Sequence, residues 1–129
     1  SCANHPTQYA VIEALNGSQE ESIKMAKSFR ERRDLIVKLL NGIDGFKCHS
    51  PGGAFYVWPN VTEACKKIGA KNSEEFRKIL LDKGVAVLAD IHFGGKNPGQ
   101  KQEYIRLSYA TSKEGIIEGV KRIKEFVER

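Results

Sequence analysis

Residues 104–109 have the sequence YIRLSY, in which apolar and polar side chains alternate. Because successive side chains of a strand point to opposite faces, this period predicts a β-strand that buries Ile105, Leu107 and Tyr109. The opposite face of the strand then carries Arg106. An arginine in the middle of a half-buried strand loses hydration, so it needs an anionic partner.

Two interpretations of Arg106 follow from this position. The planar guanidinium can bind a carboxylate through two parallel N–H bonds, so a small carboxylic acid is one natural ligand. The alternative is a structural ion pair with an Asp or Glu of the same domain, which is the commoner situation for arginine. The spacing of residues alone leaves both interpretations open.

The segments on either side of this strand predict helices and one more strand. Thr111 and Glu114 have the spacing of a capping box, which predicts a final helix. Residues 85–91 predict a buried strand, and Asn72 predicts the start of a helix that ends at Gly84. The side chains expected to face inward in these two helices are Phe76, Ile79, Leu80, Leu81, Ile116, Ile117, Val120, Ile123 and Val127.

The first half of the chain predicts two helices followed by two strands. Ser18 and Glu21 have capping-box spacing, so we expect a long second helix that runs to about Gly42. A helix of more than 20 residues is longer than average and often connects two bodies. Strands are expected at residues 46–49 and 54–58, where the pattern becomes β-rich.

This order of elements predicts an α+β (mixed α/β) fold: a small open sheet of about four strands, covered by helices, with a long N-terminal linking helix. We expect three parts. Residues 1–17 form an N-terminal segment with a short helix, residues 18–42 form the linking helix, and residues 43–129 form a compact domain.

Composition excludes several classes of protein. The chain has 129 residues and a net charge of +5 that is spread evenly, so no concentrated basic face for nucleic acid is expected. No apolar run reaches the length of a membrane span, and no secretory leader is recognisable. We therefore expect a cytoplasmic protein.

The chain has three cysteines, an odd number that does not suit a disulfide framework. Cys2, Cys48 and Cys65 are far apart and are interpreted as reduced thiols. Structural zinc sites need four ligands in two closely spaced pairs. The chain does not supply both pairs, so no metal site is expected.

The loop at residues 51–53, Pro-Gly-Gly, precedes an aromatic strand. Two glycines permit a positive φ or the close approach of a ligand, so Gly53 and Phe55 are candidates for the wall of a pocket. The simpler alternative is a turn that leads into a core strand. The G-x-G-x-x-G fingerprint of dinucleotide binding is absent.

Several short sequences occur together in this chain and in one enzyme family. They are SCANHPTQYA at 1–10, EALNG at 13–17, FRERRD at 29–34, PGGAFY at 51–56, GVAV at 84–87 and YIRLSYATS at 104–112. Together they resemble the C-terminal part of a class I/II aminotransferase of fold type I, which uses pyridoxal 5'-phosphate. The resemblance is strongest to the aspartate aminotransferase-like branch.

The resemblance implies that the chain is the small C-terminal domain, with its linking helix, of an enzyme that also has a large cofactor domain and forms a homodimer. Arg106 matches the arginine that binds the α-carboxylate of the amino acid or 2-oxo acid, which favours the functional interpretation of this residue. The loop with Gly53 and Phe55 would line the substrate entrance.

The same resemblance implies that the chain alone is not catalytic. The family needs a lysine that holds the cofactor covalently and moves the α-proton, normally in a Ser-x-x-Lys motif upstream of the matched region. No lysine here has that setting, so we expect no catalytic residue, and the cofactor-binding residues are unknown. The alternative is a standalone, non-catalytic domain that binds small carboxylates or a partner protein.

Overall fold

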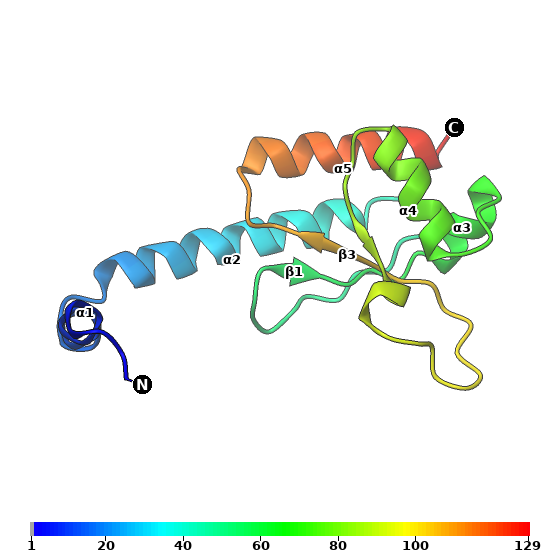
Figure 1. Ribbon diagram of the computed structural model, residues 1–129. Helices are drawn as coiled ribbons and strands as arrows, with labels where there is room; N and C mark the ends of the chain where they lie inside the picture. The colour runs from blue at the N-terminus through cyan, green and yellow to red at the C-terminus, as the bar shows by residue number, and fades with distance from the viewer. Residues whose placement is uncertain (1) are drawn as a thin grey trace.

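The structure is a computed structural model that describes residues 2–129. Its elements are, in chain order, the helices α1 (His5–Asn16) and α2 (Glu20–Leu40), strand β1 (Tyr56–Val57), helices α3 (Thr62–Ile68) and α4 (Ser73–Asp82), strand β2 (Leu88–Ala89), the 3₁₀ turn η1 (Asp90–Phe93), strand β3 (Ile105–Ser108) and helix α5 (Lys113–Val127). The mixed α+β class is confirmed. Figure 1 shows α2 and α5 on the same side of the sheet.

The sheet has three strands in the order β1-β3-β2, with both pairs antiparallel, whereas about four strands were predicted. The predicted strand at 46–49 contributes only an isolated bridge between Lys47 and Asn60. The side-chain amide of Asn41 explains this difference. It donates to the Cys48 carbonyl at 2.8 Å and accepts from the Cys48 N–H at 2.8 Å, so these backbone groups are satisfied without a neighbouring strand.

The predicted strand at 85–91 is also shorter than expected, because only β2 pairs with β3. After Ala89 the chain turns into η1, whose first residue is the buried Asp90. The carboxylate of Asp90 accepts a hydrogen bond from the Ser73 hydroxyl at 2.6 Å and from the Tyr104 N–H at 3.3 Å. These bonds compete with a continued strand ladder, so the strand ends there.

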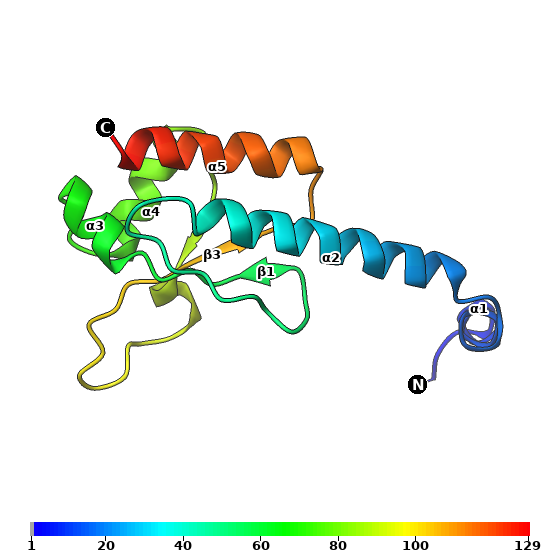
Figure 2. The same cartoon turned by 180° about the vertical axis from the view of Figure 1, so that it is seen from behind.

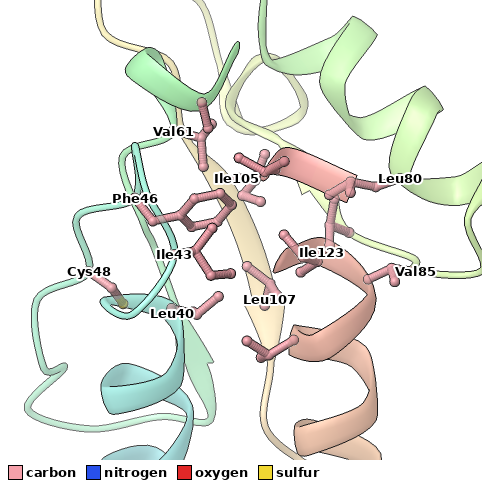
Figure 3. Close-up of a cluster of buried hydrophobic side chains, with 14 of the residues drawn as sticks. Leu40, Ile43, Phe46, Cys48, Val61, Leu80, Val85, Ile105, Leu107 and Ile123 are labelled. Carbon is pink, nitrogen blue, oxygen red and sulfur yellow. The ribbon is translucent and has the colours of Figure 1, made fainter. Parts of the chain in front are cut away.

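The hydrophobic core lies between the sheet and the helices (Figure 3). The alternation predicted for β3 is confirmed, because Ile105, Leu107 and Tyr109 are buried. They meet Leu40 at the end of α2 and Ile123 of α5, both fully buried. One face of the sheet is therefore closed by helices, and the other face remains open.

Capping residues in the sequence predict both ends of α4 correctly. Asn72 caps α4 as predicted, since its side chain accepts from the Glu75 N–H at 2.9 Å. Gly84 has the left-handed conformation expected after that helix, with φ 77°. The other two caps are displaced by one residue. Ser112 rather than Thr111 caps α5, and α2 begins after Gln19 rather than at Ser18.

Two side chains predicted to face inward are about half exposed. Leu81 of α4 and Ile117 of α5 lie beside the buried stripes of their helices, at the edge that faces solvent. Helix α1 has no buried residue at all. It lies at the far end of α2, away from the sheet, in both views (Figures 1 and 2). Over residues 2–129, no helix has the length and apolar character that a membrane crossing requires.

Candidate carboxylate-binding site

Arg106 lies in β3 on the open face of the sheet, where it is partly buried. Its guanidinium carbon, Cζ, is 4.1 Å from the ring centre of Tyr56 and 4.5 Å from that of Phe93. Both contacts have the geometry of cation–π interactions. Among residues 2–129, no carboxylate forms an ion pair with Arg106. The alternative of a structural ion pair between Arg106 and an Asp or Glu of the same domain is therefore not seen among the described residues.

The register of the sheet explains how Arg106 and Tyr56 come together. Tyr56 of β1 is opposite Ser108 of β3, and Leu88 of β2 is opposite Arg106. Because Arg106 and Ser108 are two residues apart, their side chains share one face. Tyr56 therefore reaches Arg106 diagonally across two paired strands, which is within range for long side chains.

Two more aromatic residues extend this group. The ring of Phe93 meets Trp58 edge-on, with centres 5.2 Å apart, and Trp58 stacks on Tyr104 at 6.1 Å. Strand alternation places Tyr104 on the same face as Arg106, and Trp58 on the same face as Tyr56. No local pattern could have indicated Phe93, because it lies in η1 outside any strand.

Gly53 and Phe55 line a shallow cavity of about 320 Å³ between α2 and the loop that precedes β1. The cavity is also lined by Arg33 and Tyr109, but not by Arg106. The ring of Phe55 lies 4.4 Å from that of Tyr56. The two predicted parts of the site are therefore separate, and Tyr56 lies between them.

Tyr109 fixes the loop that forms this cavity. Its hydroxyl donates to the Ala54 carbonyl at 2.8 Å, and its backbone N–H donates to the Phe55 carbonyl at 2.9 Å. Burial raises the pKa of the Tyr109 phenol, so the hydroxyl keeps its proton and remains a donor. Ala54 is held at φ 60°, a conformation that non-glycine residues rarely adopt.

A polar cluster anchors the segment between η1 and β3. Lys96 is paired with Glu103 and lies 3.8 Å from Asp90, and Glu103 also accepts from the Ser73 N–H at 2.7 Å. Nearby, the pKa of Glu74 is lowered to about 2, first by its hydrogen bond from Arg77 and then by the one from His92.

A metal ion and a covalently held cofactor each need particular side chains in the protein. In residues 2–129, no group of three or more His, Cys, Asp or Glu side chains is arranged to hold a metal. A lysine that binds a carbonyl cofactor must be able to lose its proton. Lys96 is the least exposed of the described lysines that form ion pairs, and its ammonium group lies against two carboxylates, those of Asp90 and Glu103.

Comparison with known proteins gives a consistent result. Residues 1–123 match the family described as aminotransferase class I and II. The chain is 43% identical over 122 residues to an aspartate aminotransferase of Bacillus sp. strain YM-2, covering 94% of this chain and 30% of the relative. It is 42% identical over 123 residues to an aspartate aminotransferase of Bacillus subtilis, with 95% and 30% covered.

The fold is similar to that of solved aminotransferases. The crystal structure of the aspartate aminotransferase from Rhizobium meliloti superposes with a TM-score of 0.87 at 35% identity, over 100% of this chain and 32% of that one. The chain thus spans about 30% of the length of the curated relatives that it matches.

Proposed function

Since the chain belongs to the class I and II aminotransferase family, we propose that it is the small C-terminal domain of a pyridoxal-phosphate-dependent, aspartate aminotransferase-like enzyme. In this proposal the enzyme transfers an amino group between amino acids and 2-oxo acids, and Arg106 binds the carboxylate that these substrates share. The fragment alone is inactive.

The arrangement around Arg106 is the observation that carries this proposal. Its guanidinium lies on the open face of the sheet, against the rings of Tyr56 and Phe93, without an ionic partner among residues 2–129. An arginine that is partly desolvated and has no ionic partner is suited to bind an external anion. The carboxylate of an amino acid or 2-oxo acid fits the guanidinium fork through two N–H bonds.

We assign the cofactor to another part of the enzyme. The family implies pyridoxal phosphate, but the described lysines are largely exposed or paired with carboxylates, as Lys96 is. The residues present therefore do not fit a covalent cofactor site, and the large cofactor domain would supply it. Gly53 and Phe55 would contribute one wall of the substrate entrance.

The proposed division into parts is residues 1–17, the linking helix at 18–42, and the small domain at 43–129. Exposed apolar side chains on α1 support a role in contacts outside this chain, because such side chains are usually covered in an assembly. These side chains are Tyr9, Val11, Ile12 and Leu15. We assign them to contacts with the large domain or with a second subunit of a homodimer.

The proposal is tested with Arg106→Gln in the full-length enzyme. We expect kcat/KM for amino acids and 2-oxo acids to fall by about 30- to 5,000-fold, mainly through KM, which corresponds to roughly 2–5 kcal/mol of lost charge pairing. The matched control is Arg122→Gln, which removes an exposed arginine paired with Glu118 on α5 and should leave the kinetics unchanged.

Unchanged kinetics for Arg106→Gln would remove Arg106 from the substrate site. If the full-length protein bound carboxylates but had no amino-transfer activity, the non-catalytic binding domain would be the better account.

A further inference from the structure

The guanidinium of Arg106 is held by rings from two different parts of the chain. Tyr56 belongs to β1, which pairs directly with β3, so its ring position is set by the sheet. Phe93 belongs to η1, which pairs with no strand. The contact between Phe93 and Arg106, 4.5 Å from Cζ to the ring centre, therefore depends on how η1 is fastened.

Hydrogen bonds fasten η1 near both of its ends. At the first residue, the buried Asp90 carboxylate accepts from the Ser73 hydroxyl at 2.6 Å, and the Asp90 N–H donates to the Tyr104 carbonyl at 3.0 Å. Next to Phe93, the ring of His92 is hydrogen-bonded through Nε2 to Glu74 at 2.9 Å. Three groups thus hold this segment of four residues: two belong to α4, and the third is the carbonyl of Tyr104, directly before β3.

The Phe93 side chain is nevertheless 48% exposed. Burial in the core therefore does not account for its placement, since its ring neighbours are Arg106 and the partly exposed Trp58. A large apolar ring that is held at the surface by a fastened turn, directly against the proposed ligand-binding arginine, indicates a role at the site itself.

The chemistry of the guanidinium explains what this ring can do. A cation–π contact involves the face of the aromatic ring, while a carboxylate is bound by the N–H groups at the edge of the guanidinium. Both interactions can therefore exist together. An arginine without such contacts samples many rotamers, and ordering it on ligand binding costs about 0.5–1.5 kcal/mol.

We propose that Phe93 is a positioning residue for the substrate carboxylate, acting by holding the Arg106 guanidinium in its binding orientation before the substrate arrives. This inference rests on the proposed role of Arg106. It adds a second segment, η1, to the determinants of substrate affinity, and it assigns the two fastenings of η1 a role in substrate binding.

The test uses Phe93→Leu in the full-length holoenzyme, with succinate as a non-reacting dicarboxylate probe. Leucine keeps an apolar side chain but removes the aromatic ring. We expect KM for amino acid substrates and the dissociation constant of succinate to rise by about 2- to 30-fold, the range of a cation–π contact, with a much smaller change in kcat. Phe93→Tyr keeps the ring and should restore wild-type affinity.

The matched control is Ile91→Ala, which removes an exposed apolar side chain from the same turn. It should leave both constants unchanged. If Ile91→Ala weakened affinity as much as Phe93→Leu, the effect would come from disturbance of η1, and the assigned role of the Phe93 ring would be wrong.

Arg106→Gln separates failure of this inference from failure of the proposed function. If Arg106→Gln weakens succinate binding and Phe93→Leu does not, the positioning role of Phe93 is overturned and the role of Arg106 stands. If neither substitution changes succinate binding, both assignments fall.

Discussion

At the scale of single residues, the cysteines differ sharply in environment. Cys48 and Cys65 are buried in the core, whereas Cys2 is exposed. Burial raises the pKa of Cys48 to about 11 and that of Cys65 to about 12. Since the thiolate is the reactive form, both buried thiols combine low accessibility with a very small reactive fraction near neutral pH.

We predict that iodoacetamide at about pH 8 labels Cys2 at least about 100-fold faster than Cys48 or Cys65 in the folded chain. Peptide mass spectrometry over a time course gives the three rates separately. In concentrated guanidinium chloride the three rates should converge, which is the control. Labelling of Cys65 as fast as Cys2 in the folded protein would contradict the buried position.

The candidate site shows what residue-level sequence patterns can and cannot supply. Alternation in residues 104–109 was sufficient to place Arg106 opposite a buried face, because strand geometry depends only on neighbours in sequence. The same rule could have grouped Tyr56 with Trp58. Phe93 could not be predicted, because its position depends on hydrogen bonds that η1 makes with α4 and with Tyr104, and these are contacts between distant segments.

At the scale of elements, the loop before β1 is held in a strained conformation. Ala54 has φ 60°, where its Cβ is too close to the backbone, and the hydroxyl of Tyr109 binds the Ala54 carbonyl. A left-handed conformation costs a non-glycine residue roughly 1–2 kcal/mol. Hydrogen bonds from Tyr109 therefore offset part of this strain.

We predict that Ala54→Gly raises the free energy of unfolding by about 0.5–1 kcal/mol, because glycine adopts φ 60° without strain, although it also gains freedom in the unfolded chain. Urea unfolding followed by circular dichroism measures the change. Ala64→Gly is the control of opposite sign. Ala64 is fully buried in α3, so removal of its methyl group should lower the free energy of unfolding by about 1 kcal/mol.

Helices were predicted more accurately than strands for a physical reason. Helix ends are marked by local chemistry, as at Asn72 and Gly84, so errors at the predicted ends amount to one or two residues. A strand exists only where a partner is available. The segments 46–49 and 85–91 have β-rich sequences. In the first, the Asn41 side chain satisfies the backbone of Cys48, and at the end of the second, the Asp90 carboxylate accepts the Tyr104 N–H that a longer strand ladder would use.

At the scale of the whole molecule, α1 is the element least attached to the rest. It buries no residue, although its N-terminus is capped by Asn4, whose side chain accepts from the Thr7 N–H at 2.9 Å. Its order in the structure therefore comes from local helix signals rather than from packing. Isolated helices of this length are only marginally stable in water.

We predict that removing residues 1–17 changes the free energy of unfolding of the remaining chain by less than about 0.5 kcal/mol, because no core contact is lost. Urea unfolding of the full and shortened chains gives the comparison. Truncation before Lys113 is the control, since it removes the buried stripe of α5 and should abolish folding. A large loss on removing 1–17 would show that α1 packs against the domain in solution.

Helix α2 has a mechanical consequence that follows from its shape. It is one unbroken helix of 21 residues, and its buried residues, Ile36 and Leu40, lie near its C-terminal end. With a rise of 1.5 Å per residue its length is about 30 Å, so a rotation of about 10° around the buried end moves the other end by about 5 Å. A change of about 10° in the direction of α2 would therefore displace α1 by about the pitch of one helical turn.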